Sequence, residues 1–129
     1  MIYILGYKVM TKKKKTEHVD QGGLSRPAFH ILLALVDAPK HGYAIMQEVD
    51  ERAGSRYRLW PATLYTAIKR MLAAGVIEET RAPNEAAGED PRRRFYRLTR
   101  RGRGELAQEA SRLEALLEVA REKKVLPAG

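Results

Sequence analysis

The chain contains no cysteine among its 129 residues. Disulfide bonds and thiolate metal ligands are therefore excluded, and the absence is consistent with a reducing cytosol. Histidine is scarce, with three residues, and none of them has the i, i+4 spacing of a zinc site. Ser25, His30 and Asp37 fall on one expected helix and its cap, without the sharp turn that exposes a catalytic serine. The sequence thus indicates no enzyme, no metal and no cofactor.

Long hydrophobic runs are missing as well. The first ten residues, MIYILGYKVM, are apolar but much shorter than the ~20 residues of a membrane-spanning helix. The lysines follow this apolar run, whereas a signal peptide has its basic residues in front. We therefore expect no membrane partner and a cytoplasmic location. Because the chain is polar and lacks periodicity from Lys12 to Gly23, residues 1–23 are expected to form a mobile basic extension.

Acidic residues are outnumbered by basic ones, 16 against 24, and the formal net charge is +8. The excess is concentrated in two segments. Residues 1–23 carry five basic and two acidic residues, and residues 92–103 carry seven arginines and no acid. Such clustering indicates an anionic partner, nucleic acid in particular, with a solubilising surface as the simpler alternative.

Apolar residues at helical spacing predict three helices. Their expected ranges are 25–38, 41–53 and 60–75. Ser25 and Pro61 are typical of the start of a helix, while Pro39 and Gly75 are typical of the end. The only tryptophan, Trp60, is expected to pack at the start of the third helix, with stacking on a ligand as the alternative.

The third predicted helix has two distinct faces. Its apolar residues recur at i, i+3, i+4, i+7 and i+8 and form the expected buried stripe: Leu64, Ala67, Ile68, Met71 and Leu72. On or beside the opposite face lie small polar groups, a phenol and two cations: Thr63, Tyr65, Thr66, Lys69, Arg70 and Ala73. Such a face suits the major groove of DNA, where short side chains allow close approach and cations reach guanine edges or phosphates. The alternative is an ordinary amphipathic helix with a solvated outer face.

A β-hairpin is expected after this helix. Residues 76–80, VIEET, predict a short strand, and residues 82–90 contain the Pro, Asn, Gly and Asp of a flexible tip. In the return strand, residues 93–98, aromatic and aliphatic groups can pack inward while arginines face outward. The tip is acidic, so we expect contact with the DNA backbone at the arginines of the strand base: Arg92, Arg93, Arg94 and Arg97.

The last segment predicts a long helix that needs a partner. Thr99 is a suitable cap, and apolar residues recur mostly at intervals of three, four or seven: Leu106, Ala110, Leu113, Leu116, Leu117 and Ala120. A helix of ~25 residues is roughly 37 Å long, which exceeds what one small winged domain covers. We therefore assign residues 100–126 to dimerisation, the alternative being packing against the chain's own first helix. A symmetric dimer would place two recognition helices ~34 Å apart and predicts a palindromic operator.

Three segments together resemble the PadR family of bacterial transcriptional regulators: LSRPAFHILLALVDAPKHGYAIMQEV, PATLYTAIKRMLAAGVIEE and RRRFYRLTRRG. The shared pattern is a helix ending before an HGY motif, an LY-containing recognition helix ending in G-[LV]-I, and a Y-x-L-T-x-x-G exit from the wing. The resemblance covers residues 24 to about 125 and implies the short form of the family. Ala62 and Thr66 depart from the pattern, since many members have glycine or serine at the first position and proline at the second.

The predicted fold is mainly α (α+β). Residues 24–99 are expected to form a winged helix-turn-helix with a two-stranded β-wing, followed by the dimerisation helix. His41, Gly42 and Tyr43, the HGY motif, are interpreted as a tight interhelical turn from which Tyr43 can reach a phosphate.

The resemblance implies a homodimer that binds a double-stranded DNA operator and usually represses transcription. It also implies a small hydrophobic or phenolic effector, although no residue identifies that ligand. The alternative function is a winged-helix protein-interaction or architectural module without sequence-specific DNA binding. Such a module would show a shallow salt dependence, or equal affinity for any duplex.

Overall fold

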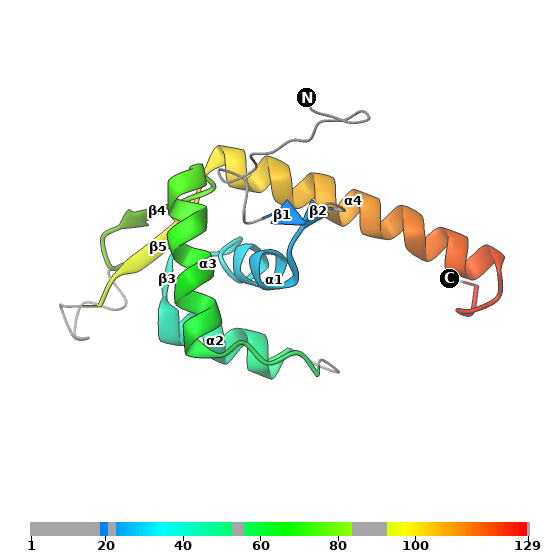
Figure 1. Cartoon of the computed structure of the whole chain (residues 1–129), viewed down its shortest axis with the longest axis horizontal. Helices are drawn as coiled ribbons and strands as arrows, with labels where there is room; N and C mark the ends of the chain where they lie inside the picture. The colour runs from blue at the N-terminus through cyan, green and yellow to red at the C-terminus, as the bar shows by residue number, and fades with distance from the viewer. Residues whose placement is uncertain (1–18, 21–22, 53–55, 84–92, 129) are drawn as a thin grey trace, which may run out of the picture.

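The computed structural model describes residues 19–20, 23–52, 56–83 and 93–128. The order of elements in these residues is β1 (Val19–Asp20), β2 (Gly23–Leu24), α1 (Arg26–Ala34), β3 (Lys40–His41), α2 (Gly42–Glu51), α3 (Pro61–Ala74), β4 (Ile77–Thr80), β5 (Phe95–Leu98) and α4 (Arg100–Glu122). Helices α1, α2 and α3 form one body with the sheet at its side, and α4 passes over this body and continues beyond it (Figure 1). The predicted winged helix-turn-helix followed by a long helix is confirmed.

Helix α1 begins where the sequence predicts. The Ser25 hydroxyl oxygen accepts a hydrogen bond from the Ala28 amide at 3.2 Å, which satisfies one of the unpaired donors of the first turn. At the other end, the Lys40 ammonium donates to the Ala34 carbonyl oxygen at 2.7 Å. Helix α1 packs against α2, α3 and α4 and supplies the centre of the hydrophobic core with Ala28, Ile31, Leu32 and Ala34.

The two predicted wing strands, β4 and β5, pair antiparallel as expected, and a third strand that the sequence did not predict, β3, extends the sheet. Its order is β3-β5-β4, with Lys40 opposite Tyr96 and His41 opposite Phe95. The HGY motif is therefore more than a turn. The backbone is extended at His41, with φ −88° and ψ 168°, and pairs with β5, while the ring Nδ1 caps α2 by accepting from the Ala44 amide at 3.1 Å. One residue thus joins the sheet to the second helix.

Strand β5 lies in the middle of the sheet and is covered on both sides. Phe95 and Tyr96 are adjacent in the strand and therefore point to opposite faces, yet each is only 5% exposed. The predicted alternation of inward apolar groups and outward arginines is wrong at this pair. Tyr96 joins the main core, whereas the Phe95 ring meets the His41 ring edge-on, with centroids 5.1 Å apart.

Helix α4 is capped as predicted and leaves the body of the fold. The Thr99 hydroxyl accepts from the Gly102 amide at 3.0 Å. Leu106 packs into the core, and further along the helix Leu116, Leu117 and Val119 are 53%, 46% and 42% exposed. Figure 1 shows that the C-terminal half of α4 runs clear of the other helices. None of the helices in the described ranges combines the length and apolar character that crossing a bilayer requires.

The end of the expected basic extension takes part in the fold. Strand β1 pairs with β2, and β2 packs against α4. At Gly23, where φ is +133°, a Cβ atom would overlap the carboxylate of Glu109. Glu109 is 6% exposed, and the guanidinium of Arg112, together with a backbone hydrogen bond from Leu24, holds its pKa below the ordinary value. Residues 1–18, the bulk of the extension, lie outside the described residues.

His30 on α1 makes the stability of the fold sensitive to pH. Its ring stacks on Tyr57, with centroids 4.5 Å apart, and Nδ1 lies 2.8 Å from a guanidinium nitrogen of Arg52. Burial first, then the charges of Arg52 and Arg26, lower the pKa of His30 from its ordinary value. At and below about pH 6.5 the imidazole of His30 is therefore protonated to a greater extent in the unfolded chain than in the folded chain.

We expect the free energy of unfolding to fall as the pH drops from 7 through 6.5 toward the lower pKa of folded His30. Urea unfolding at constant ionic strength and protein concentration, repeated across this range, measures the slope. A His30→Gln variant keeps a polar side chain of similar size and should lose the slope. An equal slope in both proteins would show that another group is responsible.

Candidate nucleic-acid interface

Helix α3 has the two faces that its sequence predicts. Leu64, Ile68 and Met71 are buried, and Ala67 and Leu72 are partly buried against the core. The helix starts at Pro61 and ends before Gly75, whose φ of +77° is a left-handed C-cap that glycine adopts without strain. Every polar or cationic residue proposed for DNA contact on this helix is exposed: Thr63, Tyr65, Thr66, Lys69 and Arg70.

A cavity of about 400 Å³ lies beside this face, where α2, α3 and β5 meet. It is lined by three phenols and two guanidinium groups, together with the N-cap and the first residue of α2: Tyr43, Tyr65, Tyr96, Arg93, Arg94, His41 and Gly42. A Cβ at Gly42 would lie 2.7 Å from the Tyr65 hydroxyl oxygen, so a side chain there would force the Tyr65 ring to shift. The cavity therefore depends on the glycine of the HGY motif, and its hydroxyl and guanidinium donors suit an oxyanion.

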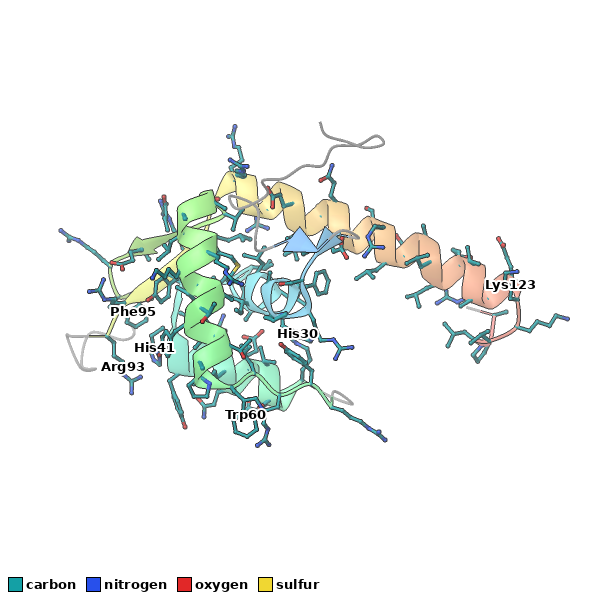
Figure 2. All side chains as sticks on the ribbon, in the orientation of Figure 1. His30, His41, Trp60, Arg93, Phe95 and Lys123 are labelled. Atoms are coloured by element: carbon teal, nitrogen blue, oxygen red, sulfur yellow. The ribbon has the colours of Figure 1, made fainter. Side chains whose placement is uncertain are left out.

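Arg93 lies at the edge of this cavity. A guanidinium nitrogen of Arg93 is 2.7 Å from His41 Nε2, and the guanidinium carbon is 6.0 Å from the centre of the Tyr43 ring. A neutral imidazole has a single acceptor nitrogen, and the Ala44 amide already donates to Nδ1 of this ring. The helix cap and the arginine thus compete for one acceptor. In Figure 2 the side chains of Arg93, His41 and Phe95 lie close together at the wing end of the molecule.

The next two arginines of the wing are paired with carboxylates across the sheet. Arg94 donates to Glu79 at 2.7 Å and Arg97 donates to Glu78 at 2.6 Å. The hydrogen bond from Arg94 to Glu79 also raises the pKa of Arg94. These pairs were missed at the sequence level, although the VIEET segment shows both acids, because the register that places Glu78 opposite Arg97 depends on the length of the hairpin. Arg92 and the acidic tip lie outside the described residues.

Trp60 does not pack at the start of α3, so that prediction is wrong. Its side chain is 60% exposed, and the Arg58 guanidinium lies 5.3 Å from the centre of its ring. The core position beneath this helix end is filled by Leu59, which is 3% exposed. A second hollow of about 200 Å³ lies here, and Tyr43 lines both hollows. Arg58 was overlooked in the sequence because the link SRYRL shows no periodicity.

The labelled residues of the two predicted surfaces lie in different parts of the molecule. Figure 2 shows His41 and Arg93 at the left of the molecule and Trp60 at the bottom, while α4 runs along the top and Lys123 lies at its far end. The two predicted surfaces, one for DNA and one for a second chain, are thus spatially separate. A dimer formed through the free part of α4 would leave the α3 face open.

The residues predicted for dimerisation fall into three groups. Leu106 is 7% exposed and belongs to the core of its own chain, because the first part of α4 packs against α1. Leu113 and Ala120 are partly buried, and Ala110, Leu116 and Leu117 are exposed. Val119, 42% exposed, was missing from the predicted set. The apolar surface available to a partner therefore begins near Leu113 and ends near the C-terminus of α4.

The sequence matches the family model described as "Transcriptional regulator PadR-like family" over residues 31–108. The match begins in α1 and ends in the first part of α4. The chain therefore belongs to the PadR-like family of transcriptional regulators, and the resemblance found in the sequence is confirmed. Membership places it among regulators of transcription rather than among enzymes.

Two relatives show how far the likeness extends. The transcriptional regulator Rv3488 of Mycobacterium tuberculosis is 36% identical over 94 residues, which cover 72% of this chain and 78% of the relative. An uncharacterised 37.1 kDa protein in transposon TN4556 of Streptomyces fradiae is 37% identical over 86 residues. The match covers 67% of this chain but only 22% of that larger protein.

Solved structures show the same fold. A PadR family transcription regulator from Clostridium difficile R20291 superimposes with a TM-score of 0.65 at 26% identity, covering 76% of this chain and 97% of that one. Bacillus subtilis PadR in complex with operator DNA gives a TM-score of 0.55 at 23% identity, covering 64% of this chain and 46% of that one. The winged helix-turn-helix described above is thus the fold of known PadR structures.

Proposed function

We propose that this chain is a sequence-specific DNA-binding repressor that acts as a homodimer on a palindromic operator. The observation that carries the proposal is that Tyr65 belongs both to the exposed polar face of α3 and to the lining of the 400 Å³ cavity. A helix face suited to the major groove and a cavity suited to a backbone phosphate are therefore continuous. The operator complex of the related Bacillus subtilis PadR supports DNA as the partner.

In this proposal the predicted DNA contacts among the described residues fall into three groups. Thr63, Thr66, Lys69 and Arg70 face the base edges or adjacent phosphates, whereas Tyr43, Tyr65 and Arg93 bind a phosphate in the cavity. Arg94 and Arg97 contribute less than an unpaired arginine because Glu79 and Glu78 already offset their charges. The exposed leucines of α4 supply the dimer contact, so that two α3 helices reach successive major grooves.

Selection of bound genomic fragments by the purified protein tests the proposal. We expect one or a few palindromic sequences to be enriched, and the selected duplex to bind at least about a thousandfold more tightly than unrelated DNA at the same salt concentration. Equal affinity for any duplex would instead support the second candidate, an architectural or protein-interaction module. The ion pairs of Arg94 and Arg97 favour that candidate, since they reduce the positive charge available to the backbone.

Three single substitutions test the contact assignment. Lys69→Ala and Arg70→Ala should each weaken operator binding by about 1 to 3 kcal/mol, because each removes a charged hydrogen-bond donor. Arg93→Ala should reduce the slope of log K against log salt by about one unit. Fluorescence anisotropy across a salt series measures both effects. Lys123→Ala, at the far end of α4, is the control and should bind as the unmodified protein does (Figure 2). Unchanged binding in all three variants would refute the assignment.

Release by a small hydrophobic or phenolic compound completes the proposal. Support comes from the family resemblance and from the apolar surface of Leu116 and Leu117, to which such a compound can add. The test is to add phenolic carboxylic acids to the preformed operator complex and to follow the anisotropy. A compound that lowers operator affinity must also bind less tightly in the presence of operator, since coupling is reciprocal.

A further inference from the structure

We propose that Trp60 recognises a thymine of the operator, because its indole ring contacts the C5-methyl group of that thymine in the major groove. The inference rests on the proposed function, since it assigns one further contact within the same DNA surface. Trp60 immediately precedes Pro61, the first residue of α3, and exposes 60% of its side chain. Residues at the N-terminal end of a recognition helix are those that contact base edges.

The indole is held in place before DNA arrives. The Arg58 guanidinium carbon lies 5.3 Å from the ring centre, within the range of a cation–π contact. The same guanidinium also lies near Asp50, with Arg58 Nε 3.8 Å from the Asp50 carboxylate. These contacts restrict the orientations of the ring and so reduce the entropic cost of binding its apolar surface.

The surroundings of the ring favour a base edge over the DNA backbone. The hollow of about 200 Å³ beside Trp60 is lined by the apolar residues Met46, Leu59 and Pro61, by Gln47, and by the Asp50–Arg58 pair. Because the Asp50 carboxylate offsets the charge of Arg58, this hollow offers a phosphate no net positive charge, and a backbone phosphate gains little there. Among the groups that base pairs present in the major groove, the thymine methyl is the apolar one.

The hollow is also continuous with the rest of the proposed DNA surface. Tyr43 lines it on one side and lines the 400 Å³ cavity on the other. A phosphate bound in that larger cavity and a base edge at Trp60 would therefore belong to one stretch of duplex. Tyr43 and Tyr65, which are 55% and 52% exposed, extend the same aromatic surface between the two points.

The test uses the full chain and the duplex obtained by genomic selection, with each thymine replaced in turn by deoxyuridine. This replacement removes only the methyl group. We expect one symmetry-related pair of positions at which it lowers the affinity of the unmodified protein about fourfold per methyl. Trp60→Ala should lower the affinity for the original duplex and abolish the difference between thymine and deoxyuridine there. Val36→Ala, which shortens another exposed apolar side chain, should keep both the affinity and the difference.

The fluorescence of Trp60 gives a second measurement, because it is the only tryptophan in the chain. Its emission should move to shorter wavelength when the selected duplex is added. The proposal is overturned if the emission does not change, or if Trp60→Ala responds to deoxyuridine as the unmodified protein does. Specific operator binding with either of these results would refute the role of Trp60 alone. An absence of any duplex preference in the unmodified protein would refute the proposed function and this inference together.

Discussion

Replacement of Gly102 by alanine is expected to lower the free energy of unfolding by about 3 kcal/mol. Gly102 lies in the first turn of α4, where a Cβ atom would overlap the backbone carbonyl oxygen of Val76 and lie 2.9 Å from Leu98 Cδ1. The same carbonyl accepts a hydrogen bond from the Thr99 amide at 3.1 Å, so α4 cannot move away without breaking that bond. Urea unfolding followed by circular dichroism measures the effect.

Gly104 provides a matched control in the same helix. Beyond its chain neighbours and the backbone of its own helix, no atom lies within 4 Å of a Cβ built at this residue. Because alanine favours helix over glycine, Gly104→Ala should raise the free energy of unfolding by about 0.5 to 1 kcal/mol. Both variants should be compared at one protein concentration, since dimer formation adds to apparent stability. Equal effects of the two substitutions would show that the contact with Val76 does not limit the packing of α4.

Leu117→Glu is expected to convert the proposed dimer to a monomer and to weaken operator binding by about two orders of magnitude. Leu117 is 46% exposed in the chain, so the substitution leaves the fold of the monomer intact. In a symmetric interface the new charge is buried twice without a partner. A monomer also loses the increase in affinity, about a hundredfold or more, that a dimer gains because binding of one subunit to its half-site holds the second subunit near the other half-site. Light scattering after size exclusion and anisotropy with the selected duplex measure the two effects.

Gln108→Glu adds the same charge at an exposed position of the same helix. Positions 108 and 117 are nine residues apart, which places them on opposite sides of a helix with 3.6 residues per turn. The control should therefore remain dimeric and bind DNA normally. Persistence of the dimer in Leu117→Glu would mean that the chains associate through a different surface.

The parts of the fold that the sequence predicted correctly are set by local chemistry. The start of α3 at Pro61, its end at Gly75 and its buried stripe follow from capping and periodicity within about four residues. Strand β3 could not be found in this way, because its pairing joins His41 to Phe95, more than fifty positions away. The burial of Phe95 beside Tyr96 has the same origin, since it requires a third strand and the His41 ring.

In the candidate site, too, features set by local geometry were predicted, and features that depend on distant parts of the chain were not. The exposed face of α3 was predicted because helical geometry alone places Lys69 opposite the core. The pairing of Arg97 with Glu78 was not predicted, because it depends on the register between β4 and β5, and the sequence leaves the length of the loop between them open. Trp60 was misplaced because its burial depends on competition with Leu59 for one core position, and periodicity does not decide such a competition.

One hydroxyl group connects the two halves of the molecule. The Thr99 side chain donates to the Gly75 carbonyl oxygen at 2.7 Å and accepts from the Gly102 amide, so it joins the end of α3 to the start of α4. With Gly102 packed against Val76 at the same point, the joint between the two helices is stiff. If α4 rotated against the α4 helix of the other subunit in a dimer, α3 would therefore move with it. The distance between the two recognition helices, and hence the spacing of half-sites that one dimer can span, would be determined at Thr99.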